Sequence, residues 1–148
     1  MALKFDQFAQ EGNTFLKEYA KALNLGKDVD KAGRILSATL HALREIISVE
    51  ESLQLISQLP MFLKAVYVNG WSMHKHERIK TTTDFIDLAR KFDGIKSISD
   101  FESDEVAENY IRTTFIQLRK YISLGEMEDI RTALPKDLKH LVYQDIMF

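Results

Sequence analysis

Two stretches of this sequence, ISVEESLQLISQLPMFLK (residues 47–64) and ISLGEMEDIRTALPKDLK (residues 122–139), are similar along their whole length and decide the fold. Each residue of the first stretch aligns with the residue 75 positions later in the chain. A repeat of this kind indicates one structural unit of about 70 residues that is present twice. Over residues 32–67 the identical positions are Ala32, Thr39, Leu43, Arg44, Ile47, Ser48, Glu51, Leu59, Pro60, Leu63 and Lys64. At an offset of 77 positions, Phe8 and Phe15 fall on Phe85 and Phe92.

Signals for helix starts occur at matching places in both copies. Ser48 and Ser123 are each followed three residues later by a glutamate, which is the pattern of a capping box. In that motif the serine accepts a hydrogen bond from the third helical N–H, and the glutamate returns a bond to the serine. Pro60 and Pro135 suit the first turn of the next helix, where a missing N–H costs nothing. The apolar residues recur at helical spacing almost throughout, so each unit is expected to contain about four helices.

The residues that both copies share are expected to be structural. Leu43, Ile47, Leu59 and Leu63, with their counterparts in the second copy, are predicted to form the core of each unit. Arg44 matches Arg119 in the same way, and we expect both arginines to pair with acidic groups at helix ends.

We therefore predict an all-α fold, in which two pseudo-repeated units of about four helices pack as one globular, bundle-like domain over residues 1–148. The first unit comprises residues 3–71, a linker comprises residues 72–80, and the second unit comprises residues 81–148. Two prolines and six glycines leave little room for the frequent turns of a β sandwich.

Composition excludes several classes of function. The net charge is −2, from 20 basic and 22 acidic residues, so no overall field favours nucleic acid. The chain has no cysteine, which removes thiol nucleophiles and thiolate metal sites and fits a reducing compartment. The opening MALKFDQFAQEG lacks the apolar core of a signal peptide, and no run approaches the ~18 apolar residues of a membrane span. We expect a soluble cytoplasmic protein that does not bind membranes.

Four short segments carry a resemblance to a known family. They are LHALREIIS (residues 40–48), QLP (58–60), YVNGW (67–71) and, in the second copy, GEMEDIRTALP (125–135). With these segments the chain resembles the bacterial domain of unknown function 2267 family along nearly its full length. The resemblance implies an all-helical bacterial protein of two similar units. It implies no activity, and it brings no catalytic residues with it.

The segment YVNGWSMHKHERIK (residues 67–80) occurs in one copy only, so it is free to be functional. His74 and His76 could both face a metal ion in an extended chain. Two imidazoles do not make a closed site, however, and no thiolate can complete it. We therefore predict no metal and no cofactor. Trp71 is predicted to be largely buried between the two units, and the polar residues 72–80 are predicted to be exposed.

His41 is a second candidate site residue that the second copy does not share, since Ile116 occupies the matching position. It lies four residues before Glu45 on a predicted helix, and a histidine beside a carboxylate could act as a general base. The structural alternative is a half-buried histidine with a satisfied hydrogen bond.

Three hypotheses about function remain open at this point. The first is a non-catalytic cytosolic binding or adaptor module that contacts an unidentified protein partner and has no catalytic residues. Its candidate contact residues are His41, Tyr67, Trp71 and His74. The second is a small-molecule or metal-dependent enzyme centred on His41, Trp71, His74 and His76. The third is a homodimer that buries an exposed apolar groove.

Overall fold

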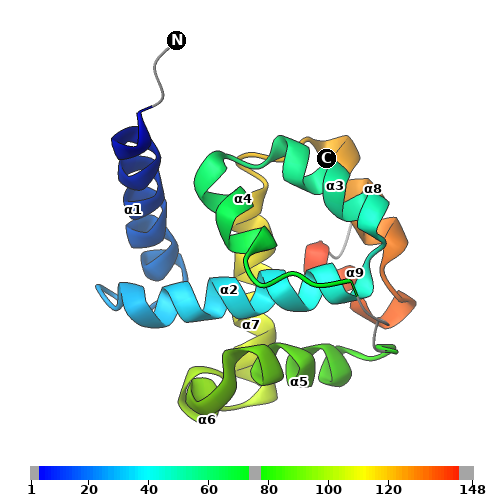
Figure 1. Cartoon of the computed structure of the whole chain (residues 1–148). Coiled ribbons are helices and arrows are strands. Elements are labelled where there is room, and N and C mark those ends of the chain that lie inside the picture. Colours follow the sequence, from blue (N-terminus) through cyan, green and yellow to red (C-terminus); the bar gives the residue numbers. More distant parts are fainter. Residues whose placement is uncertain (1–3, 74–77, 144–148) are drawn as a thin grey trace.

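The computed structural model describes residues 4–73 and 78–143, and all regular structure within these ranges is helical (Figure 1). The all-α prediction is confirmed. Before the linker the helices are α1 (Phe5–Ala22), α2 (Val29–Ile46), α3 (Val49–Gln58) and α4 (Met61–Val68). After it they are α5 (Thr82–Asp93), η1 (Gly94–Lys96), α6 (Ser97–Asp100), α7 (Asp104–Leu118), α8 (Leu124–Ala133), η2 (Lys136–Leu138) and α9 (Lys139–Val142). None of the described helices is both long enough and apolar enough to cross a membrane.

Polar side chains cap five of the described helices, including α3 and α8 at the two serines predicted from the sequence. In each case the side-chain oxygen accepts a hydrogen bond from the backbone N–H three residues later, which satisfies one of the free donors at a helix N-terminus. The capping residues are Asp28 for α2, Ser48 for α3, Thr81 for α5, Ser103 for α7 and Ser123 for α8.

The reciprocal half of the capping-box prediction is wrong for α8. The Ser123 N–H donates to the side-chain Oε1 of Gln58 at 2.7 Å, so a residue from the end of α3 satisfies this donor. Glu126, which was expected to return this bond, lies instead within 4.8 Å of Glu51 of α3. The reason is tertiary packing, because α3 and α8 lie side by side (Figure 1).

The predicted core positions are buried in both copies of the similar stretch. Their exposed fractions range from 0 to 5% for Leu43, Ile47, Leu59, Leu63, Leu118, Ile122, Leu134 and Leu138. Each of these side chains therefore loses nearly all of its contact with water, which is the main source of stability in a helical domain of this size.

The segments before and after the linker pack extensively against each other. Helix α2 runs along α5, and α7 crosses α2 (Figure 1). One buried hydrogen bond joins α1 to α7: the Tyr19 hydroxyl lies 2.6 Å from Thr114 Oγ1. Thr114 donates its own hydroxyl proton to the Tyr110 carbonyl at 2.8 Å, so Tyr19 must be the donor in the first bond. Burial raises the pKa of the Tyr19 hydroxyl, which keeps it protonated.

Close approach between α1 and α4 depends on Gly12. A Cβ atom at this position would lie 3.1 Å from the Cβ of Phe62, so Phe62 would have to shift by a few tenths of an ångström to admit a side chain there. Helix α1 continues through Gly12 without a break. Its N-terminal end stands away from the other helices, and Phe5 is 70% exposed (Figure 1).

Candidate functional site

An open cleft of about 420 Å³ lies between α1, α2 and α5. Helix α2 provides most of its lining, including Arg34, while α5 contributes Phe92 and Asp93, and α1 contributes Leu16. Charged and apolar side chains therefore meet in one concave surface, the usual character of a binding site for a small group or side chain.

Arg34 in the lining of the cleft is held by Asp100 of α6, which lies behind the lining and is 1% exposed. Arg34 binds this carboxylate with two hydrogen bonds, from Nε at 2.8 Å and from Nη2 at 3.0 Å. Such a bidentate pair is the strongest arrangement that an arginine and a carboxylate can make. Burial alone would raise the pKa of Asp100, but the hydrogen bonds from Arg34 hold it below its ordinary value. Asp100 is therefore ionised at neutral pH.

Asp93 is the second carboxyl group of this part of the molecule, and it lines the cleft. Its Oδ2 is buried and accepts no hydrogen bond from the described residues. Burial, together with the neighbouring Asp100, raises the pKa of Asp93 to about 7. Since Asp100 keeps its negative charge, a proton shared by the two carboxyl groups resides on Asp93. At neutral pH, Asp93 can thus present either a hydrogen-bond donor or a negative charge to the cleft.

His41 lies two helical turns beyond Arg34 on α2. It is half-buried, with its ring edge against Phe92 at a centroid distance of 5.9 Å. Its Nε2 lies 2.7 Å from the Val66 carbonyl and must donate the hydrogen bond, because a carbonyl only accepts. Burial lowers the pKa of the imidazole, so His41 is neutral at neutral pH. Its partner is thus a backbone carbonyl, as in the structural alternative considered for this residue.

The candidate residues of the segment after α4 are partly described. Tyr67 is fully buried, and its hydroxyl lies 2.7 Å from the Ser52 hydroxyl. The rings of Trp71 and Tyr67 form a T-shaped contact with their centroids 5.9 Å apart, and Trp71 is half-buried, which is less than the sequence predicted. Ser72 and Met73 after it are exposed, but the prediction that residues 72–80 are exposed is wrong for Ile79, which is half-buried because its apolar side chain packs against the core. His74 and His76 lie outside the described residues.

The two matched arginines bind helix ends, but through carbonyls rather than acidic groups. Arg44, which is 4% exposed, donates from Nη1 to the carbonyls of Tyr67 and Asn69, both at 2.7 Å. Arg119 donates from Nη2 to the Val142 carbonyl at 2.7 Å. These carbonyls end α4 and α9, where helical acceptors lack partners within the helix. The expectation of acidic partners at these helix ends is therefore corrected.

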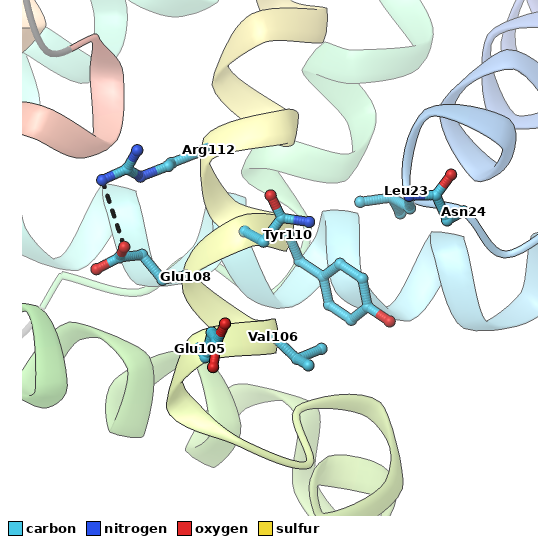
Figure 2. Close-up of a pocket in the computed structure, with 8 residues that line it drawn as sticks. Leu23, Asn24, Glu105, Val106, Glu108, Tyr110 and Arg112 are labelled. Carbon is cyan, nitrogen blue, oxygen red and sulfur yellow. Dashed lines mark ion pairs between the residues drawn. The ribbon is translucent and has the colours of Figure 1, made fainter.

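A second hollow of about 480 Å³ lies between α7 and the end of α1. Figure 2 shows Tyr110 and Val106 on the side of α7 where Leu23 lies, while Glu108 and Arg112 lie on the other side of α7. Glu108 and Arg112 form an ion pair of 3.3 Å there. Because these polar groups do not converge on one point, this hollow lacks the geometry of a reaction site.

The sequence did not reveal Asp93 and Asp100 as site residues. A buried aspartate looks like any exposed aspartate in a sequence, and Arg34 lies 66 positions before Asp100. One signal was present on α2, where Arg34, Ser37 and His41 recur at helical spacing along a single face.

Comparison with known proteins adds a family but no chemistry. A family model described as "Uncharacterized conserved protein (DUF2267)" matches residues 12–141. None of the curated proteins matches the chain.

Proposed function

The chain belongs to the DUF2267 family of uncharacterized conserved proteins, and membership in this family does not indicate a reaction. We propose that the chain is a non-catalytic helical binding module of the bacterial cytoplasm. The absence of cysteine supports the reducing compartment. In this proposal the module recognises a protein partner through the surface around η1 and α6.

The observation that carries the proposal is the exposure of two isoleucines. Ile95 is 97% exposed and Ile98 is 86% exposed, so water surrounds nearly the whole of both side chains. They are three residues apart in consecutive helical segments and therefore share a face. Covering such a pair with a partner recovers about 1.5–3 kcal/mol for each side chain. Neither isoleucine packs against the core, so the fold itself gives no reason for apolar residues there.

The neighbouring cleft adds polar recognition to this apolar pair. Phe92 and Asp93 at the end of α5 line the cleft, and Gly94 and Ile95 follow them directly in the chain. A partner segment that covers the isoleucines can thus place a side chain near Asp93. A basic side chain, or one that accepts a hydrogen bond, would match the two protonation states of that carboxyl group.

The occupied hydrogen bonds of the polar groups support binding rather than catalysis. Arg34 is committed to Asp100, and His41 Nε2 is committed to the Val66 carbonyl. The enzyme alternative, centred on His41, Trp71, His74 and His76, would need these groups to converge. The described contacts instead place His41 against Phe92, and Trp71 against Tyr67.

His41, Trp71 and His74 are proposed as further contacts with the partner. His41 lies beside Phe92 at the border of the cleft, where its exposed portion can face a partner. Trp71 offers the uncovered part of its indole, with buried Tyr67 supporting it from inside. His74 follows in the same segment of the chain.

Site-specific photo-crosslinking in the cells that naturally contain the protein tests this function. A photoreactive phenylalanine analogue replaces Ile95 in one variant and Ile98 in another. The matched control carries the analogue at Leu53 of α3, which is 56% exposed on a different helix. We expect one defined adduct from positions 95 and 98, and none from position 53.

The mass of the adduct distinguishes the partners. An adduct with twice the mass of the chain would identify a second copy and favour the homodimer hypothesis. If positions 95 and 98 give no adduct, or give the same products as position 53, the proposed binding surface is refuted.

A further inference from the structure

Three carboxylates meet where α3 lies against α8. Glu51 belongs to the first turn of α3, Glu126 to the first turn of α8, and Asp129 follows one turn later on α8. One oxygen of each carboxylate lies within 4.8 Å of an oxygen of both others. The three residues also form a gradient of exposure, from buried Glu126 through half-buried Glu51 to exposed Asp129.

The buried carboxylate oxygens of this cluster accept no hydrogen bond from the described residues. Glu126 is 4% exposed, and its Oε1 is inaccessible to water and has no hydrogen-bond partner among the described residues. Glu51 Oε1 is inaccessible and unpartnered in the same way. A carboxylate oxygen that is removed from water and given no donor is costly, so native structures supply such an oxygen with a proton, a basic side chain or a metal ion.

The described residues include a comparable carboxylate pair, Asp93 and Asp100, that does have a basic partner. At Asp93 and Asp100, the guanidinium of Arg34 supplies a positive charge. None of the ion pairs within residues 4–73 and 78–143 includes Glu51, Glu126 or Asp129. The described side chains therefore supply no positively charged partner to this cluster.

We infer that Glu51, Glu126 and Asp129 form a binding site for a hard divalent cation, with calcium as the best fit. Carboxylate oxygens are the ligands that calcium and magnesium prefer. The three oxygens lie within 4.8 Å of one another, so one calcium ion can contact all three at its usual ligand distance of about 2.4 Å. Magnesium demands a near-ideal octahedron at about 2.1 Å, whereas calcium accepts irregular geometry, so carboxylates that come from two separate helices suit calcium better.

The exposed side of the cluster provides the rest of the coordination. Calcium takes about 6–8 oxygen ligands, so water must complete a shell begun by three carboxylates. Asp129 faces solvent, where such waters can bind and where the ion can enter. A site with few protein ligands and an open side belongs at the weak end of calcium affinities, with a Kd of about 10⁻⁴–10⁻³ M. Because Glu51 and Glu126 come from different helices, the bound ion would join α3 to α8.

Two-dimensional ¹H–¹⁵N NMR of the full chain, freed of metal with a chelator, tests the inference by titration with CaCl₂. We expect saturable shifts of amide signals in the first turns of α3 and α8, with the same Kd for both helices. Glu126→Gln and Glu51→Gln should each weaken binding at least about tenfold, since each removes one of three charged ligands. Glu50→Gln is the matched control, because Glu50 is exposed in the same first turn and lies outside the cluster.

The outcomes separate a cation site from a pair of carboxyl groups that share a proton. Saturable shifts that are lost in Glu51→Gln and kept in Glu50→Gln support the site. Absence of saturable shifts with millimolar CaCl₂ overturns it, as does equal binding by all the variants. If Glu126→Gln fails to fold, the half-buried Glu51 decides the test by itself. A parallel titration with MgCl₂ that gives tighter binding than calcium would overturn the choice of ion.

Discussion

Replacing Arg44 and Arg119 with methionine, one at a time, should destabilise the protein to different extents. The two arginines occupy matching positions, and methionine keeps most of the apolar stem of each side chain. Arg44 is 4% exposed and makes two short hydrogen bonds to the carbonyls of Tyr67 and Asn69. Arg119 is only half-buried and makes one such bond, to the Val142 carbonyl.

The expected magnitudes follow from these bonds. A hydrogen bond to a charged donor contributes about 1.5–3 kcal/mol, and a buried acceptor left without a partner adds to the loss. Arg44→Met should therefore lower the free energy of unfolding by about 3–5 kcal/mol, and Arg119→Met by about 1.5–3 kcal/mol. Arg78→Met provides a control at an exposed arginine, where a change within about 0.5 kcal/mol is expected.

Urea denaturation followed by circular dichroism measures these free energies. Equal losses for Arg44→Met and Arg119→Met would refute the reasoning, because the number of carbonyl acceptors would then not matter. A loss below about 1.5 kcal/mol for Arg44→Met would show that water replaces the guanidinium at the end of α4.

Three further outcomes are expected. Leu43→Ala and Leu118→Ala should each lower the free energy of unfolding by about 2–5 kcal/mol in urea melts, since both leucines are 1% exposed; a loss under about 1 kcal/mol would contradict their core role. The pKa of Glu126 is raised to about 7 in the folded chain, so its stabilising protonation is complete below about pH 4.5 and is lost as the pH rises through about 7. Chelator-treated wild type should therefore lose stability between about pH 5 and pH 8 more steeply than Glu126→Gln, and parallel pH profiles would contradict this. Trp71 is half-buried against Tyr67, so its fluorescence maximum and acrylamide quenching should lie between those of buried and free indole; the emission of free indole would disprove this packing.

The parts of the fold that depend on local signals could be predicted from the sequence. The serine caps of α3 and α8 and the buried leucines follow from the repeat and from helical spacing. The sequence pattern around each serine could not show that Glu51 and Glu126 lie close together, because α3 and α8 come together only through tertiary packing. The expectation of no metal was argued from histidines and the absence of cysteine, and it did not consider Glu51 and Glu126 as neighbours.

The cleft was hidden from the sequence for a related reason. Asp100 gives no local sign that it is buried, and its partner Arg34 is distant in the chain. His41 was noticed because it lacks a counterpart, yet the Val66 carbonyl that satisfies it is equally invisible without the fold. Contacts between distant segments thus account for what sequence reasoning missed.

The packing of α2 along α5 has a consequence for how the chain unfolds. The helices before the linker (α1–α4) bury part of their apolar surface against the helices after it (α5–α9), because α2 packs along α5. The buried hydrogen bond from Tyr19 of α1 to Thr114 of α7 also joins these two halves. Unfolding of one half would therefore expose the core of the other half to water. We expect the two halves to unfold together in one cooperative transition. For the same reason, a chain cut between α4 and α5 can regain its structure only by fragment complementation. The core residues of each half are therefore constrained by contacts with the other half.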